Sequence, residues 1–173
     1  MIYLAFGSNL KSRFGNSVLT IQKSYSELEK HGIEIVKKSS FYKSKAYPNP
    51  KDPEFINSVA LVKTKANPRK LLNIILAVEK KFGRKRMIKN DPRTLDIDII
   101  DYSSRCINTS YQNMELNLPH PNIESRLFVL GPLYEINSKW KNPSSGKQID
   151  KLIAKIGNFG DNKITKLWLF DIV

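Results

Sequence analysis

Residues 55–100 read FINSVALVKTKANPRKLLNIILAVEKKFGRKRMIKNDPRTLDIDII and predict a strand, a helix and a second strand. The first eight residues are almost wholly apolar, which is typical of a strand buried on both faces. Asn67 and Pro68 form a helix start, with an asparagine cap and a proline in the first turn. Apolar residues at helical spacing continue this helix to Gly83. A charged loop follows, and residues 95–100 form the second strand.

The preceding residues supply the other half of the pattern. We expect a buried strand at 3–6, an amphipathic helix at 13–30 and a strand from 33 to about 42. Three prolines make 43–53 a loop. The resulting β-α-β-β-α-β order is that of ferredoxin-like folds. The sequence therefore predicts an α+β core with a mainly antiparallel sheet flanked by helices.

The remaining residues are expected to add elements to this core. An edge hairpin is expected within 103–118, and a helix at 125–136 whose central proline predicts a break. A further helix is expected at 148–156 and a last strand at 164–170. The C-terminal elements are assigned to the same domain as the core.

Size and composition are those of one globular domain, here residues 1–173. The apolar content of 40% and the charged content of 26% are ordinary values. A single cysteine, Cys106, allows no internal disulfide, which favours a reducing, cytoplasmic location. The N-terminus lacks the basic segment of a signal peptide, and the chain lacks the roughly 18 apolar residues of a membrane span.

The chain is strongly basic, with a net charge of +13. Residues 80–93 contain seven Lys or Arg and one acid, Asp91. Such a charge attracts nucleic acid, anionic membranes or phosphorylated small molecules, and charge alone does not choose among them.

Two acids lie in the strand at 95–100. Because strand side chains alternate, Asp96 and Asp98 point to one face, about 7 Å apart. Hard oxygen ligands favour Mg²⁺, which proteins usually hold with one or two carboxylates and substrate phosphates. Two histidines and one cysteine in the chain argue against a soft-ligand zinc site. The alternative is an exposed edge strand with alternating polar residues.

A basic segment precedes these acids: Glu79 is followed by GRKR at 83–86, Lys89 and Arg93. Arginine forks suit phosphate oxygens. Acids that hold metal beside bases that hold a triphosphate are the layout of phosphoryl transfer. The chain has no Walker A glycine loop. The alternative is a disordered basic loop after a helix.

A third group combines aromatic and amide side chains. Phe55 and Asn57 share a strand face, where a ring and an amide can stack a flat heterocycle and bind its edge. His120 lies between two prolines, and Phe128 follows soon after. The alternative places the phenylalanines in the core and gives the histidine a structural role.

Taken together, the motifs resemble the 6-hydroxymethyl-7,8-dihydropterin pyrophosphokinase family and span about residues 3–136. They are FGSNL at 6–10, FIN at 55–57, Glu79 with GRKR at 83–86, PRTLDID at 92–98, LPHP at 118–121 and FVLGPLYEI at 128–136. The resemblance implies transfer of pyrophosphate from Mg-ATP to the pterin hydroxyl in folate synthesis.

The resemblance also implies roles for individual residues. Asp96 and Asp98 would hold two Mg²⁺ ions, and together with Arg84 and Arg93 they would be catalytic. The nucleotide would be contacted by Glu79, Arg84, Arg86, Arg93, His120 and Arg126. The pterin would be contacted by Ser44, Lys45, Tyr47, Phe55, Asn57 and Phe128, with the two phenylalanines on opposite faces of its ring.

One departure from the family stands beside the acids: Asn90 and Asp91 occupy the place of the usual Trp-Gly. Two alternatives remain open, an inactive pterin- or nucleotide-binding relative and a basic RNA-binding module on a ferredoxin-like scaffold. Against the RNA module, the chain lacks an RNP1-like segment, and RNA binding gives no reason for the acidic pair. We therefore expect a monomer that binds small molecules and neither nucleic acid nor membrane.

Overall fold

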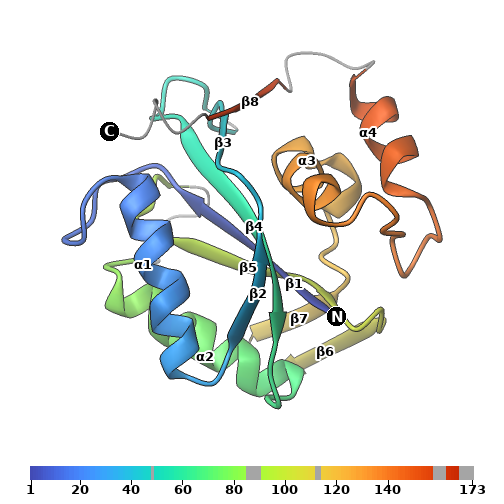
Figure 1. Ribbon diagram of the computed structural model, residues 1–173, viewed down its shortest axis with the longest axis horizontal. Helices are drawn as coiled ribbons and strands as arrows, with labels where there is room; N and C mark the ends of the chain where they lie inside the picture. Colours follow the sequence, from blue (N-terminus) through green and yellow to red (C-terminus); the bar gives the residue numbers. More distant parts are fainter. Residues whose placement is uncertain (48, 85–90, 112–113, 158–162, 168–173) are drawn as a thin grey trace.

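A central antiparallel sheet carries helices on both faces (Figure 1). The computed structural model describes residues 1–47, 49–84, 91–111, 114–157 and 163–167. The strands of the sheet are β1 (Ile2–Ser8), β2 (Glu34–Lys38), β3 (Tyr42–Ser44), β4 (Phe55–Lys63), β5 (Asp96–Tyr102) and β8 (Ile164–Lys166). Their order is β5-β1-β4-β3-β8, with β2 also paired to β4, and every pairing is antiparallel. The predicted combination of helices and antiparallel sheet is confirmed.

Helices α1 (Ser17–Lys30) and α2 (Pro68–Lys81) cover one face of the sheet. The predicted start of α2 is confirmed, because the Asn67 side chain accepts a hydrogen bond from the Lys70 N–H at 2.9 Å. The start predicted for α1 was too early. Asn16 caps this helix through the Leu19 N–H, and residues 12–15 form a turn before it.

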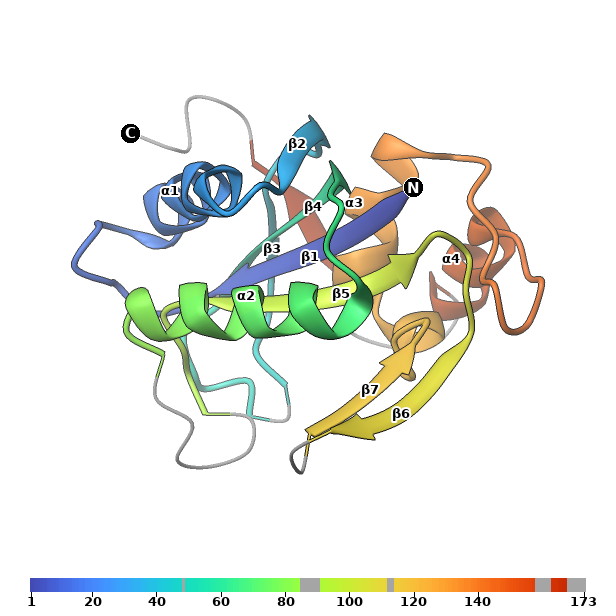
Figure 2. The same cartoon turned by 90° about the horizontal axis from the view of Figure 1, so that it is seen from below.

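The opposite face is covered by α3 (Leu127–Ile136), with α4 (Ile149–Gly157) packed against α3 and a short 3-10 helix at Ile123–Ser125 before them (Figures 1 and 2). The break expected at Pro132 is wrong. Pro132 is buried and lies inside α3, whose apolar residues pack on the sheet. This packing offsets the hydrogen bond that proline cannot donate.

Further sequence predictions need correction. The single strand expected from 33 to about 42 is divided into β2 and β3 at residues 39–41, where the Ser39 hydroxyl accepts a hydrogen bond from the Val59 N–H. Residues 43 and 44 belong to β3, so the loop expected at 43–53 starts at residue 45. The expected hairpin exists as β6 (Ile107–Tyr111) and β7 (Met114–Leu118). It forms a separate two-stranded sheet rather than an edge of the main sheet. The last strand is Ile164–Lys166, and 168–170 lie outside the described residues.

Covering both faces of the sheet has a consequence for function. An RNA-recognition module with this strand order leaves one sheet face open to stack bases, whereas here helices lie over each face. No helix within the described residues is long and apolar enough to cross a membrane.

Candidate active site

A cavity of about 660 Å³ opens where β1, β4 and β5 meet the N-terminus of α3. Ten of the residues proposed from sequence line it: Ser44, Lys45, Tyr47, Phe55, Asn57, Arg93, Asp96, Asp98, Arg126 and Phe128. They come from segments that are far apart in the chain. The fold therefore joins the acidic group and the aromatic group in one site.

The two acids lie as strand alternation predicts. Asp96 and Asp98 face the cavity, while Ile97 and Ile99 point the other way into the core under α1 and α2. Burial, followed by the neighbouring charge of Asp96, raises the pKa of Asp98 to about 6. The pair therefore concentrates negative charge on one wall of the cavity.

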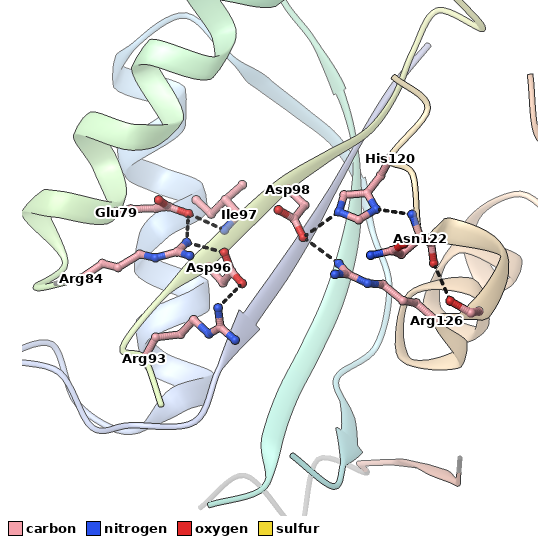
Figure 3. Close-up of polar contacts among 10 residues, drawn as sticks. Glu79, Arg84, Arg93, Asp96, Ile97, Asp98, His120, Asn122 and Arg126 are labelled. Carbon is pink, nitrogen blue, oxygen red and sulfur yellow. Dashed lines mark hydrogen bonds and ion pairs between the residues drawn. The ribbon is translucent and has the colours of Figure 1, made fainter. Parts of the chain in front are cut away.

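Behind Asp96, a buried ion-pair cluster fixes the first acid (Figure 3). Arg84 pairs with both Asp96 and Glu79, the latter at 2.5 Å. Glu79 is only 1% exposed and also accepts the Ile97 N–H at 2.8 Å. Burial alone would lower the pKa of Arg84, but the charges of Asp96 and Glu79 outweigh it and raise the pKa. Arg84 therefore remains a cation that holds Asp96 against α2.

A second cluster surrounds the other acid. The Arg126 Nη1 lies 3.1 Å from an Asp98 oxygen, and the His120 Nε2 lies 3.8 Å from it (Figure 3). Burial, followed by the charge of Arg126, lowers the pKa of His120 to about 4. Its Nδ1 accepts the Asn122 N–H at 3.1 Å. At neutral pH the histidine therefore carries its proton on Nε2, on the side of Asp98.

Other residues of the cavity lining are aromatic or carry an amide. Asn57 is 5% exposed, and its Nδ2 donates to the Ser44 hydroxyl at 2.9 Å. The Arg93 guanidinium lies 5.4 Å from the Phe55 ring centroid, and that of Arg126 lies 5.8 Å from Phe128. Each ring thus has one arginine that also pairs with an acid.

Not every proposed residue lines the cavity. Glu79, Arg84 and His120 contact the acids from behind or beside them. Tyr47 does line the cavity, but it is 82% exposed. Arg86 lies outside the described residues.

The donor set fits Mg²⁺. Among the described residues, no three His, Cys, Asp or Glu side chains are grouped closely enough to hold a metal by themselves. Two carboxylates facing one cavity match an ion that takes its other ligands from phosphates and water. The raised pKa of Asp98 agrees, because a cation would offset the paired negative charge.

Sequence reasoning missed several lining residues. Gly7 lies in the cavity floor, where an added Cβ would stand 3.6 Å from Phe55 and 3.8 Å from Asp96. Its place in the FGSNL motif was the available signal. Asn122 and Ser125 also line the cavity, and no pattern in the sequence distinguishes them from ordinary loop residues.

Comparison with known proteins identifies relatives over most of the chain. Residues 3–138 match the family described as 7,8-dihydro-6-hydroxymethylpterin-pyrophosphokinase (HPPK). A 2-amino-4-hydroxy-6-hydroxymethyldihydropteridine pyrophosphokinase of Synechocystis is 42% identical over 72% of this chain and 62% of its own length. The enzyme of that name from Haemophilus influenzae is 36% identical over 95% of this chain and 96% of its own. The folic acid synthesis protein fol1 of Pneumocystis carinii is 34% identical, and this chain spans 20% of its length.

Solved structures share the fold. Wild-type Plasmodium falciparum HPPK-DHPS has a TM-score of 0.68 at 15% identity, covering 89% of this chain and 44% of that one. An HPPK-DHPS crystallised with substrates has a TM-score of 0.69 at 14% identity, covering 89% and 42%.

Proposed function

The chain belongs to the 7,8-dihydro-6-hydroxymethylpterin-pyrophosphokinase family, and from this premise we propose that it transfers pyrophosphate from ATP to 6-hydroxymethyl-7,8-dihydropterin in folate synthesis. The observation that carries the proposal is the cavity itself, which is lined by Asp96 and Asp98 together with Phe55, Asn57 and Phe128. One half suits a metal-bound polyphosphate, and the other suits a flat heterocycle with a polar edge.

The reaction joins the pterin hydroxyl oxygen to the β-phosphorus of ATP. The bond that breaks joins this phosphorus to the bridging oxygen of the α-phosphate. AMP leaves with that oxygen, and the hydroxyl proton is released. The protein takes little part in the covalent chemistry, so substrate positioning and charge stabilisation supply most of the rate acceleration.

We assign the metal to Asp96 and Asp98, with two Mg²⁺ ions as the expected number. When bound, Mg²⁺ would neutralise phosphate charge and stabilise the attacking and leaving oxygens. Arg93 and Arg126 now pair with these acids at 3.2 and 3.1 Å. Both guanidiniums also line the cavity, so they are placed to bind phosphate oxygens of the nucleotide. Arg84 stays as the fixed counter-charge of Asp96 and Glu79.

The remaining roles follow the same division of the cavity. Phe55 and Phe128 stack the pterin between them, and Asn57 with Ser44 binds its polar edge. His120 donates its Nε2 proton toward the phosphates beside Asp98. Lys45 and Tyr47 close the rim, and Arg86 belongs to the nucleotide side.

Further assignments extend beyond the site. The order β5-β1-β4 followed by β2 and β3, with antiparallel neighbours throughout, supports the ferredoxin-like core. Contacts of α3 with β8 and α4 support one domain over residues 1–173, with 137–173 as its C-terminal addition. We also propose a monomer that acts in the cytoplasm.

A product assay tests the function. Purified protein is incubated with Mg-ATP, with and without 6-hydroxymethyl-7,8-dihydropterin, and the nucleotides are separated. We expect AMP only when pterin is present, and none after removal of Mg²⁺ with EDTA. Formation of ADP would instead indicate transfer of a single phosphoryl group. Absence of nucleotide turnover would overturn the proposal and favour a binding protein.

A further inference from the structure

Asn9 belongs to the FGSNL motif, yet it neither lines the cavity nor has a role in the proposed reaction. It directly follows β1 and is 7% exposed. Its side chain bonds to two different loops. The Oδ1 accepts the Arg93 N–H at 2.7 Å, and the Nδ2 donates to the Pro53 carbonyl at 3.0 Å.

The backbone strengthens the first of these connections. The N–H groups of Asn9 and Leu10 both donate to the Arg93 carbonyl, at 3.0 and 3.2 Å. Both backbone polar groups of Arg93 are therefore bonded to this two-residue segment. The segment itself is anchored, because β1 is paired with β4 on one side and β5 on the other.

The position of Arg93 matters because its side chain touches both halves of the cavity. The Nη1 lies 3.2 Å from Asp96, and the guanidinium lies 5.4 Å from the Phe55 ring centroid. A guanidinium on a long side chain reaches one place reproducibly only if its backbone is fixed. Arg93 has no helix or strand of its own to fix it, since β5 begins at Asp96.

The second connection concerns the other substrate. Pro53 lies in the segment that connects β3 to β4, two residues before Phe55, the first residue of β4. The same segment contains Lys45 and Tyr47, which line the cavity. The buried side-chain amide of Asn9 therefore connects Arg93, which is assigned to the phosphates, with the segment of Pro53, which is assigned to the pterin side.

We propose that Asn9 is a positioning residue that holds Arg93 and Pro53 at a fixed separation, so that the two substrates are correctly placed relative to each other. This inference rests on the proposed function, and it gives a role to a residue that does not line the cavity. The two contacts can be tested separately, because the Asn9 Oδ1 binds Arg93 and the Asn9 Nδ2 binds Pro53.

The kinetic test uses Asn9→Ala and Asn9→Asp. Asn9→Ala loses both bonds, so we expect kcat to fall by at least about 10-fold and the pterin KM to rise. Asn9→Asp keeps the acceptor and loses the donor, so it should raise the pterin KM while retaining more of kcat. The matched control is Asn67→Ala, which removes the cap of α2. It should lower the free energy of unfolding and leave kcat and the pterin KM close to those of the wild type. Equal kcat losses in Asn9→Ala and Asn9→Asp would overturn the assignment of Oδ1 to Arg93.

Amide hydrogen exchange tests the same contacts without any turnover. In Asn9→Ala we expect the Arg93 N–H to exchange at least about 10-fold faster, while amides within β1 keep their protection. Unchanged protection at Arg93 would overturn the inference. If the wild-type protein forms no AMP, the proposed function fails, and exchange at Arg93 alone then decides whether Asn9 fixes that residue.

Discussion

The guanidinium of Arg93 lies over the ring of Phe55, 5.4 Å from its centroid. The same guanidinium pairs with Asp96 at 3.2 Å. Arg93 thus links the aromatic wall of the cavity to the acidic wall, which are expected to bind different substrates. A planar, delocalised guanidinium can make both contacts at once, since it can stack through its face and donate through its edge.

We expect Arg93→Lys to lower kcat roughly 10- to 100-fold and to change the pterin KM less. Lysine keeps the charge but loses the fork and the stacking face. Rapid-quench single turnovers, with ATP and pterin bound beforehand, measure the chemical step. Arg93→Ala is the reference for complete removal. Wild-type rates in Arg93→Lys would show that charge alone is needed at this position.

Asp98→Asn should lower Mg²⁺-dependent turnover roughly 10³-fold while the fold survives. Its partners Arg126 and His120 can still donate to the amide oxygen. Because burial opposes the charge of Asp98, the amide should not lower the free energy of unfolding measured in EDTA. Turnover near that of the wild type would disprove the metal assignment, and a large loss of stability would point to a structural role.

Phe128→Ala should weaken pterin binding about 3- to 10-fold or more, because it removes one stacking face. ATP affinity should change little. Phe128→Leu separates the causes, since it keeps apolar area and loses the aromatic face. Titration calorimetry with each ligand measures both affinities. If pterin binds equally well to Phe128→Ala, its ring does not stack there.

The parts of the fold that sequence predicts best are those with strong local signals. The helix after Asn67-Pro68 and the alternation through Asp96 and Asp98 both follow from short-range geometry. Prediction failed where tertiary packing decides. Pro132 remains helical because α3 is buried on the sheet, and no local pattern contains that information.

The site shows the same division. Side-chain chemistry and the family motifs predict roles for the acids, the arginines and the aromatic pair, and the fold places Asp96, Asp98, Arg93, Arg126, Phe55 and Phe128 around one cavity. The role that we propose for Asn9 has no local sequence signal, because an asparagine after a strand usually means a turn. Its importance depends on Pro53 and Arg93, which are 44 and 84 residues away in the chain.

Stability should depend on pH through Glu27. Its Oε1 accepts from Lys81 at 2.6 Å, joining α1 to α2, and this bond lowers the pKa of Glu27. A depressed carboxyl pKa stabilises the fold above the ordinary glutamate pKa, and the effect is lost as pH falls through the folded value. Glu27→Gln should therefore lower the free energy of unfolding by ~1 kcal/mol at pH 7 and by much less at pH 3. Urea unfolding at both pH values measures this, with exposed Glu29→Gln as the control. A difference that persists unchanged at pH 3 would exclude the charge as its cause.

The attachment of the C-terminal strand to the site can be tested at Gly131. An added Cβ there would overlap the Cδ1 of Ile164, and Ile164 pairs with the pocket residue Ser44 across β8 and β3. Alanine at a helix interior position otherwise gains about 1 kcal/mol over glycine, so the sign of the stability change in Gly131→Ala depends on this overlap.

In the wild-type background we expect Gly131→Ala to lower the free energy of unfolding and to raise the pterin KM. In Ile164→Val, which lacks the Cδ1, the same substitution should be neutral or stabilising. The double-mutant cycle should therefore give a coupling energy of about 1 kcal/mol or more. Additive effects would mean that α3 and β8 adjust independently, and β8 would then have no part in shaping the pterin side of the cavity.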